Sequence, residues 1–141
     1  MIVMKISDGL GNQMFQYALA KRLSIKHDCK LKLDLDWYND REKYGGTDRK
    51  FTLDRFNIEY EEATQRDMNQ VLRFHTLAKY LIDSNIPDPF LPITGRMLNY
   101  YREIQDSKSD DIDWSYRRMF HDGILDVQRG YIDGYWQAPQ Y

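Results

Sequence analysis

Cysteine, proline and glycine are scarce, and the chain has no long hydrophobic run. Its 141 residues include one cysteine, Cys29, four prolines and eight glycines. A single thiol excludes an intramolecular disulfide and favours a reducing compartment. Cys29 is interpreted as structural, because it lies where a strand is expected to begin and not beside a catalytic base. The apolar opening MIVMKIS is too short to span a bilayer and lacks a signal-peptide layout. We therefore expect a soluble, cytoplasmic, bacterial-like protein that is at most peripheral to the inner membrane.

An excess of charge of one sign is also missing. The sequence has 20 basic and 22 acidic side chains, so its overall balance carries no footprint for nucleic acid or an anionic membrane. A hydrophobic content of 42% with 14% aromatic residues excludes a disordered tail, and the length suits one domain, residues 1–141. The 11 tyrosines and three tryptophans suit a sugar-binding cleft, although most are expected in the core.

The first forty residues have the pattern of a strand, a helix and a second strand. A strand covered on both faces is predicted from the apolar residues Ile2, Val3, Met4 and Ile6. A helix should follow, with Asn12 as its N-cap and a buried stripe of Phe15, Ala18, Leu19 and Leu23. Alternation over residues 30–37 predicts the second strand. Short links between these elements predict a right-handed parallel unit and an α/β fold, with a parallel sheet flanked by helices.

The rest of the chain is interpreted as loops and two further regular elements. A helix is predicted over residues 63–82, with a buried stripe of Met68, Val71, Leu72, His75, Ala78 and Ile82. An extended stretch is predicted over residues 130–136, ahead of Pro139, which suits the first position of another helix. Irregular structure is predicted for residues 38–50, for 51–58 as an extended piece or turn, around Pro87, Pro89 and Pro92, for residues 107–113, and for a turn at Asp122 and Gly123.

The stretch DGLGNQMFQY, residues 8–17, partly fits the dinucleotide fingerprint GxGxxG. Gly9 and Gly11 occupy the first two glycine positions, but Met14 occupies the third, where a small residue packs helix on strand. Asp34 and Asp36 lie where a ribose-binding acid is expected. A nucleotide-dependent oxidoreductase is therefore one hypothesis. A structural alternative is that the glycines only permit the turn.

Four segments together resemble one enzyme family. They are DGLGNQMFQYALAKRLS at residues 8–24, KLKLDL at 30–35, LDRFNI at 53–58 and GYWQ at 134–137. In that order and approximate spacing they are similar to the galactoside alpha-1,2-fucosyltransferases, glycosyltransferase family 11, which begin with a strand and GGLGNQ-M/L-FQYA and later contain GYWQSEKYF. The resemblance implies a two-lobed, inverting glycosyltransferase of the GT-B type, with a Rossmann-like N-terminal lobe. It implies transfer of L-fucose from GDP-fucose to the 2-hydroxyl of a terminal beta-galactoside, in the carbohydrate metabolism of glycans or O-antigen.

The resemblance also assigns roles to individual residues, without a cofactor or a metal. Asp8 replaces the family's leading glycine, and Ala138, Pro139 and Gln140 replace its SEK. The acidic pair Asp34 and Asp36 forms a DxD pattern but is interpreted as solvated or turn-capping acids. The catalytic base is not identified. The donor is expected to contact Gly9, Gly11, Asn12 and Gln13, and the acceptor Tyr135, Trp136 and Gln137.

The family's second signature, HxRRGD, is missing from the sequence. None of the three histidines, His27, His75 and His121, begins the pattern H-x-R. That arginine belongs to the donor lobe and would stabilise the departing diphosphate. The sequence is thus interpreted as the N-terminal lobe alone, with little or no turnover by itself. It would be a truncated copy, or part of a split enzyme that needs a partner lobe, and an exposed lobe face favours self-association.

Overall fold

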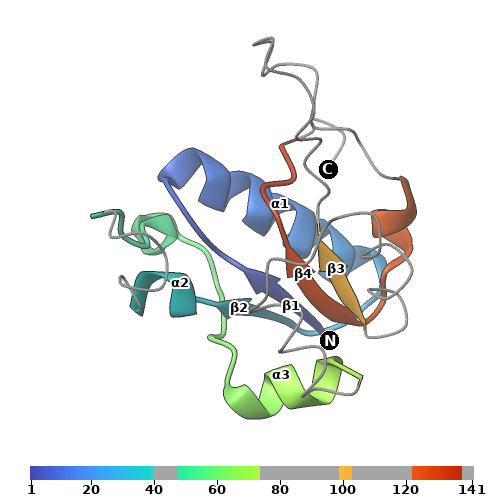
Figure 1. Ribbon diagram of the computed structural model, residues 1–141. Helices are drawn as coiled ribbons and strands as arrows, with labels where there is room; N and C mark the ends of the chain where they lie inside the picture. Colours follow the sequence, from blue (N-terminus) through green and yellow to red (C-terminus); the bar gives the residue numbers. More distant parts are fainter. Residues whose placement is uncertain (40–47, 74–98, 103–121, 138–141) are drawn as a thin grey trace, which may run out of the picture.

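A four-stranded parallel sheet forms the centre of the protein in a computed structural model (Figure 1). The structure describes residues 1–39, 48–73, 99–102 and 122–137. Its strands are β1 (Ile2–Lys5), β2 (Leu31–Asp34), β3 (Tyr100–Arg102) and β4 (Gly130–Asp133), in the spatial order β2-β1-β4-β3. The helices are α1 (Leu10–Lys26), α2 (Asp36–Asn39) and α3 (Gln65–Val71), with short 3-10 turns η1 (Leu53–Arg55) and η3 (Asp122–Asp126). The predicted α/β class is confirmed.

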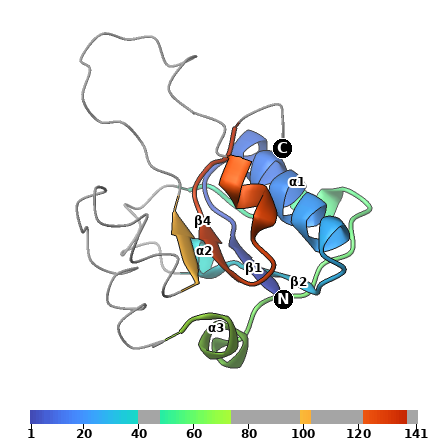
Figure 2. The same cartoon turned by 90° about the vertical axis from the view of Figure 1, so that its right-hand side faces the viewer.

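The opening β1–α1–β2 unit is the parallel unit that the sequence predicts. Ile2 of β1 aligns with Leu31 of β2 on one side and with Gly130 of β4 on the other. Strand β1 is thereby paired along both edges, and three of its four residues are buried. Helices α1 and α3 lie on opposite faces of the sheet (Figures 1 and 2). The apolar run at the N-terminus is explained by this double cover, because both faces of β1 meet packed side chains.

Alternation along the strands divides the core into two clusters. Ile2 and Met4 point toward α1, whereas Val3 points toward α3. The α1 cluster is the larger and contains Ile6, Leu19, Leu23, Leu33, Ile132 and Trp136 among others. The α3 cluster consists of Val3, Val71, Leu72, Tyr100 and Tyr131. Within the described residues no helix is long and apolar enough to cross a membrane.

Helix α1 differs from the prediction at its start and on its buried face. It begins at Leu10 with Gly9 as N-cap, so Asn12 lies in the first turn and does not cap the helix. Phe15 is 39% exposed and Ala18 is exposed. The buried side consists of Gln13, Gln16, Leu19, Ala20 and Leu23. The predicted stripe is right for Leu19 and Leu23, but two glutamines that find hydrogen-bond partners are buried in place of Phe15 and Ala18.

Strand β2 is shorter than predicted, and its last residue is not solvated. It ends at Asp34, and α2 begins at Asp36, where the sequence predicts continued strand. Asp34 is 9% exposed, and its carboxylate accepts a hydrogen bond from the Asp36 backbone N–H at 3.0 Å. The turn-capping part of the sequence interpretation is therefore right for Asp34. Its assignment to a solvated face is wrong, because the sheet buries that side too.

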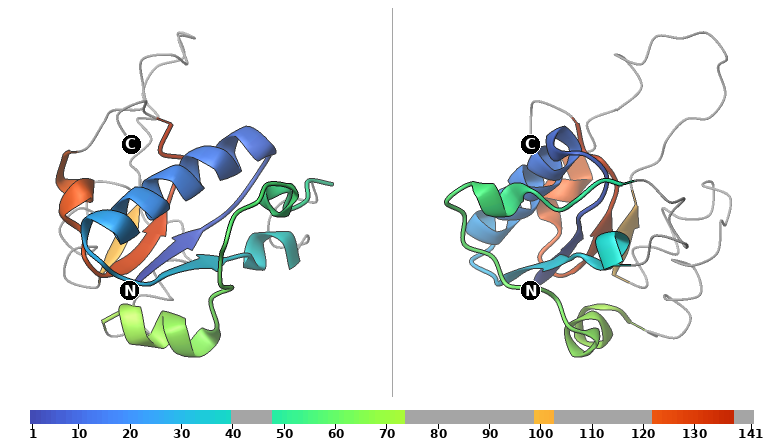
Figure 3. Two further views of the ribbon diagram at one scale, coloured as in Figure 1. Left: turned by 180° about the vertical axis from the view of Figure 1, so that it is seen from behind. Right: turned by 90° about the vertical axis from the view of Figure 1, so that its left-hand side faces the viewer.

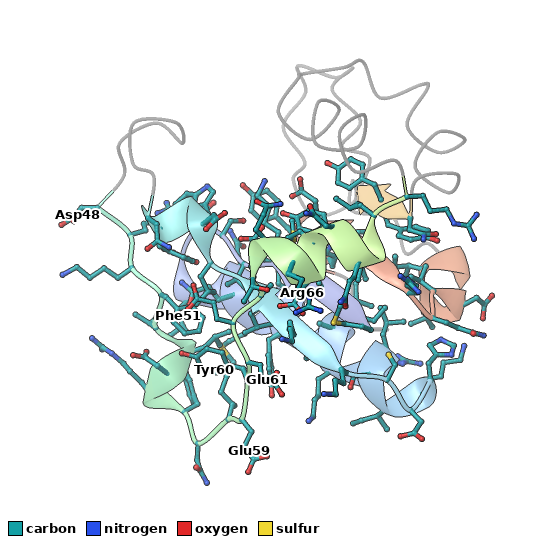
Figure 4. The ribbon with its side chains drawn as sticks, turned by 90° about the horizontal axis from the view of Figure 1, so that it is seen from below. Asp48, Phe51, Glu59, Tyr60, Glu61 and Arg66 are labelled. Atoms are coloured by element: carbon teal, nitrogen blue, oxygen red, sulfur yellow. The ribbon has the colours of Figure 1, made fainter. Side chains whose placement is uncertain are left out.

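The outer edge of β2 is covered by the segment that follows η1. Leu33 donates its backbone N–H to Glu61, at 2.9 Å, and accepts from Ala63, at 2.7 Å. The rings of Phe51 and Tyr60 pack against each other across this segment, with centroids 5.3 Å apart (Figure 4). The predicted extended piece at residues 51–58 thus contains the 3-10 turn η1, with Leu53 buried.

The later elements agree with the prediction in part. Helix α3 ends at Val71, and the extended backbone of Leu72 interrupts the predicted helix over 63–82 at that point. Strand β4 stops at Asp133, short of residue 136, and η3 occupies the predicted turn at Asp122. Strand β3 has no counterpart in the sequence prediction. His75, Ala78, Ile82, the three prolines 87, 89 and 92, residues 107–113 and Pro139 lie outside the described residues.

A capping box and an ion pair hold α3 beside the sheet. Thr64 accepts from the Asp67 backbone N–H, and Asp67 accepts in return from the Thr64 N–H at 2.8 Å. The same carboxylate accepts from Lys32 Nζ of β2 at 3.0 Å. These contacts lower the pKa of Asp67 to about 2, with the Thr64 hydrogen bonds as the largest cause and Lys32 after them. Position 67 therefore couples helix initiation to helix docking.

We predict an acid-sensitive contribution to stability from Asp67. Its pKa is lowered in the folded state, so the stabilisation is complete above pH 4 and disappears as the pH falls toward 2. Denaturant unfolding of the wild type and of Asp67→Asn should differ at pH 6 and converge near pH 2. The exposed Asp54→Asn serves as control and should show no such convergence. An Asp67→Asn difference that is constant from pH 6 to pH 2 would contradict the prediction.

Candidate functional site

The turn between β1 and α1 lies at the carboxyl ends of the parallel strands, where open α/β sheets bind their ligands. Two distant segments meet it there. One follows β4 and contributes Tyr135 and Gln137, and the other precedes η1 and contributes Arg49, Lys50 and Thr52. The structure therefore brings the predicted donor-binding residues together with two of the three predicted acceptor residues.

Asp8 is the residue on which this turn is built. Its φ of 69° lies in the left-handed region that favours glycine. The Asp8 carboxylate accepts from the Gly9 N–H at 3.1 Å and from the Tyr135 hydroxyl at 3.2 Å, and it forms an ion pair with Arg49. A negative charge beside an anionic ligand would be unfavourable, but Arg49 balances the charge of Asp8.

Gln13 holds the turn from inside. Its side chain is fully buried, and Nε2 donates to the carbonyl oxygens of Asp8 and Lys50, both at 2.9 Å. Oε1 accepts from Thr52 N at 3.0 Å and from Thr52 Oγ1 at 3.3 Å. Tyr38 also donates its hydroxyl to the Asp8 carbonyl at 3.0 Å, and burial raises its pKa, so it stays protonated. Both donors and both acceptor positions of the Gln13 amide are thus used within the chain.

Gln16 joins the ends of two strands and was not singled out by the sequence. It is fully buried, its Oε1 accepts from Ser7 N at 3.0 Å, and its Nε2 donates to Ser7 Oγ at 3.1 Å. Nε2 also donates to the Gly134 carbonyl at 2.9 Å, just after β4. The sequence signal for this role is a pair of glutamines three residues apart, Gln13 and Gln16, in a helix that has no acidic residue.

The first turn of α1 presents backbone N–H groups outward. The first intrahelical bond runs from Gln13 N to the Gly9 carbonyl, at 3.1 Å, so the amides of Leu10, Gly11 and Asn12 precede it. Asn12 Oδ1 accepts from Gln137 Nε2. Within the described part of the chain, no hydrogen bond is made by the Nδ2 group of Asn12. This end of the helix offers positive potential and donors to an anion.

The two glycines of the turn are not required by the turn itself. Gly9 has a φ of −79°, which other residues adopt readily, and a Cβ there would approach only Arg49 Nη1, at 3.9 Å. A Cβ on Gly11 would meet nothing within 4 Å. By contrast, Gly130 has a φ of 158°, and a Cβ there would lie 2.6 Å from the Tyr101 ring. Space outside Gly9 and Gly11 is open for a ligand to approach the backbone.

The three predicted acceptor residues divide into two groups. Tyr135 and Gln137 contact the turn, as described above, and both are half-buried. Trp136 is 2% exposed and belongs to the α1 core cluster, with a φ of 53° that turns the chain between its two neighbours. Trp136 packs the core, and its neighbours line the turn.

The geometry does not fit the dinucleotide fingerprint. Met14, at the third glycine position, is 50% exposed and points away from the helix–sheet contact that this glycine would serve. Asp34, one candidate for binding ribose, accepts from the Tyr131 hydroxyl at 2.6 Å and from Asp36 N. The oxidoreductase hypothesis therefore has no geometric support.

A buried row of polar groups crosses the α3 face near the same edge of the sheet, and sequence reasoning missed it. Lys5 Nζ lies 3.2 Å from the Asp133 carboxylate, which also accepts from the Tyr100 hydroxyl at 3.1 Å. Tyr131 bonds to Asp34 beside them, and its pKa is raised by burial and by both carboxylates. Within the described ranges, no three His, Cys, Asp or Glu side chains are grouped to hold a metal ion. This row links all four strands of the sheet through side-chain contacts.

The fold and the turn together define the class: an α/β protein with a parallel, Rossmann-like sheet and an open helix N-terminus at the carboxyl ends of its strands. A comparison with characterised proteins adds a relative. The chain is 43% identical over 58 residues to an alpha-1,2-colitosyltransferase of Escherichia coli. The aligned residues are 41% of this chain and 19% of that protein. The match thus spans about a fifth of the relative's length. No protein-family model and no solved structure matches the chain.

We predict that the buried Gln13 side chain contributes more to the free energy of unfolding than an exposed glutamine side chain does. Gln13→Ala removes the partner of Thr52 N and of the Lys50 carbonyl, while the Asp8 carbonyl keeps the Tyr38 hydroxyl, at a cost of about 1–3 kcal/mol in the free energy of unfolding. The matched control is Gln65→Ala, whose exposed amide bonds only to the Asn69 side chain and should cost under about 0.5 kcal/mol. Urea unfolding measures both, and equal losses would contradict this role for Gln13.

Proposed function

We propose that this chain is part of a glycosyltransferase that binds a nucleotide sugar at the start of α1. The observation that carries the proposal is the pair Gly9 and Gly11, which no internal contact requires, placed beside three outward amides. A glycine within a helix costs stability relative to alanine, so its presence without a structural need suits close approach of a ligand to the backbone. The partial match to a colitosyltransferase supports the same class.

We further propose alpha-1,2 transfer of L-fucose from GDP-fucose to the 2-hydroxyl of a terminal beta-galactoside. The fucosyltransferase family that the sequence resembles and the colitosyltransferase share the alpha-1,2 linkage in their names. They differ in the sugar transferred, so colitose is the alternative donor sugar. The reaction proposed here inverts the anomeric centre and needs no cofactor or metal, with a galactose-terminated glycan as acceptor.

The proposed roles follow the contacts of each residue. The amides of Leu10, Gly11 and Asn12 would bind phosphate oxygens, and Asn12 Nδ2 would donate to phosphate or sugar. Because the Gln13 amide is fully used, we propose that it shapes the site and does not contact the donor through its side chain. Arg49, whose side chain is 52% exposed, balances the charge of Asp8 beside Gly9, so the turn presents no net negative charge to an anionic donor.

Tyr135 and Gln137 flank the donor side of the turn and are the proposed acceptor contacts. Each is tied to the turn, Tyr135 through Asp8 and Gln137 through Asn12. Their contact with the turn would place an acceptor hydroxyl close to the donor sugar. Positioning of two substrates in this way contributes to transfer before any group acts as a base.

We predict that GDP-fucose binds this chain and that two substitutions in the turn, Gly11→Ala and Asn12→Ala, weaken this binding. The two differ in their effect on folding stability. Gly11→Ala should raise the free energy of unfolding, by about 0.5–1 kcal/mol, because alanine is the better helix residue and its methyl group meets open space. The same methyl group should weaken GDP-fucose binding at least about fivefold, because it blocks approach to the backbone. Asn12→Ala should weaken binding with little change in folding. Calorimetry and urea unfolding give the two readouts.

The controls separate the hypotheses. Asn57→Ala, on an exposed segment after η1, should change neither quantity. NAD should give no heat of binding, and NAD binding in place of GDP-fucose would favour the oxidoreductase. Gly11→Ala and Asn12→Ala that bind GDP-fucose as the wild type does would refute the assigned site.

We also predict little turnover by the 141-residue chain alone. Inverting transfer needs a stabilised leaving diphosphate, and the arginine of the HxRRGD signature is missing from the sequence. A product-release assay with GDP-fucose and lactose should therefore stay near the uncatalysed rate, even where calorimetry detects binding. Robust turnover would show that residues 1–141 suffice for catalysis and would contradict this prediction.

A further inference from the structure

The Asp8 carboxylate is surrounded by hydrogen-bond donors from three separate segments. It accepts from the Gly9 backbone N–H at 3.1 Å and from the Tyr135 hydroxyl at 3.2 Å, and it pairs with the Arg49 guanidinium. Both views of Figure 3 show the start of α1, the segment before η1 and the stretch after β4 at one end of the sheet. A guanidinium, a hydroxyl and a backbone amide at a helix start are groups by which proteins bind phosphate. The three donors thus have the composition of an anion subsite, and the chain's own carboxylate fills it.

The backbone of the turn does not depend on this carboxylate. The Asp8 carbonyl oxygen accepts from Gln13 Nε2 at 2.9 Å and from the Tyr38 hydroxyl at 3.0 Å, and these bonds do not involve the Asp8 side chain. Glycine adopts a φ of 69° without the steric cost that a Cβ brings. Glycine at position 8 would therefore keep the same backbone, and the carboxylate has a role other than shaping the turn.

The subsite adjoins the outward amides of α1. Gly9 directly precedes Leu10, and a Cβ on Gly9 would approach only Arg49 Nη1, at 3.9 Å, so the guanidinium borders the open side of the turn. The side chains of Asp8 and Arg49 are 20% and 52% exposed, so a ligand can reach both. A ligand with two phosphate groups, one at the α1 amides, would bring the other next to Asp8, which repels it and holds the hydrogen-bond donors that it needs.

We propose that Asp8 is an internal anion, which occupies the subsite for one phosphate group of the ligand. Carboxylate and phosphate both accept through negatively charged oxygens, so Asp8 stands in for the phosphate. While it does so, Arg49 and Tyr135 are engaged, and only the α1 amides serve the ligand. A phosphate group that displaces the carboxylate gains the guanidinium, the hydroxyl and the Gly9 amide. Assignment of the ligand as a nucleotide diphosphate rests on the proposed function, whereas the competition between Asp8 and phosphate does not.

Calorimetry with inorganic pyrophosphate tests the proposal. Asp8→Gly empties the subsite and suits the backbone, so it should bind pyrophosphate at least about tenfold more tightly than the wild type. Asp8→Asn removes the same charge but leaves a side chain of similar size in place, and its gain should stay below about threefold. Arg49→Ala in the Asp8→Gly background should cancel the gain, because the guanidinium is the charged member of the donor set.

Matched substitutions on η1 serve as controls. Asp54→Asn removes an exposed negative charge, and Arg55→Ala in the Asp8→Gly background removes an exposed cation. Neither should change the affinity for pyrophosphate by more than about twofold, because exposed charges away from the ligand are screened. Urea unfolding checks that each variant is folded.

A titration of the wild type, followed by NMR, needs no variant. At high concentration, pyrophosphate should shift the signals of the Gly9 amide and the Arg49 guanidinium, because phosphate oxygens replace the Asp8 carboxylate there. Shifts confined to Leu10, Gly11 and Asn12 would show that Asp8 is not displaced, and would overturn the proposal.

The variants can overturn it as well. Equal gains for Asp8→Gly and Asp8→Asn would mean that Asp8 acts through its charge alone, and a gain that survives Arg49→Ala would place the phosphate elsewhere. No gain for a folded Asp8→Gly would leave the carboxylate a purely structural role. GDP should gain as pyrophosphate does, and a gain for pyrophosphate alone would exclude a nucleotide diphosphate as the occupant. Failure of GDP-fucose to bind any variant would refute the proposed function, but would leave the pyrophosphate result standing.

Discussion

The structure depends on two buried carboxamides in the first two turns of α1. Gln13 links the β1–α1 turn to the segment before η1, and Gln16 links the ends of β1 and β4. A buried amide without partners would destabilise the fold, but these amides replace water with backbone groups in fixed positions. Three segments far apart in sequence, residues 7–16, 50–52 and 134, are thereby held around one helix end.

Because both glutamine side chains bond within the chain, the groups that hold the turn in place are distinct from those that stay accessible to a ligand. Asp8 adopts a left-handed backbone, and its charge is balanced by Arg49, so the turn is rigid and nearly neutral on its inner side. Gly9, Gly11 and the first amides of α1 remain on the outer side. Because buried contacts already fix the positions of these backbone donors, ligand binding costs little conformational entropy at this turn.

Much of the fold follows from the sequence, and the failures have identifiable causes. The doubly covered strand at Ile2–Lys5 and the parallel unit were predictable, because a short apolar run and short links leave few alternatives. The buried face of α1 was predictable only in part: Leu19 and Leu23 are buried as expected, but apolar periodicity treats glutamine as a surface residue and assigns Phe15 and Ala18 to the core. The buried contacts of Asp34 and Asp133 were not predictable, because their tyrosine partners come from strands whose pairing no local pattern reveals. At the site, the motif predicted which residues gather, but only tertiary contacts show that Gln13 points inward and Trp136 fills the core.

The order β2-β1-β4-β3 has a consequence for synthesis on the ribosome. Strand β1 emerges first but acquires its second neighbour, β4, only after residue 130 has been made. Until then a nascent chain carries a hydrophobic strand with one open edge, and closing the sheet spans more than a hundred residues of separation. Completion of this fold is therefore late and cooperative, and a chain interrupted before β4 would present the edge of β1 to chaperones or to other nascent chains.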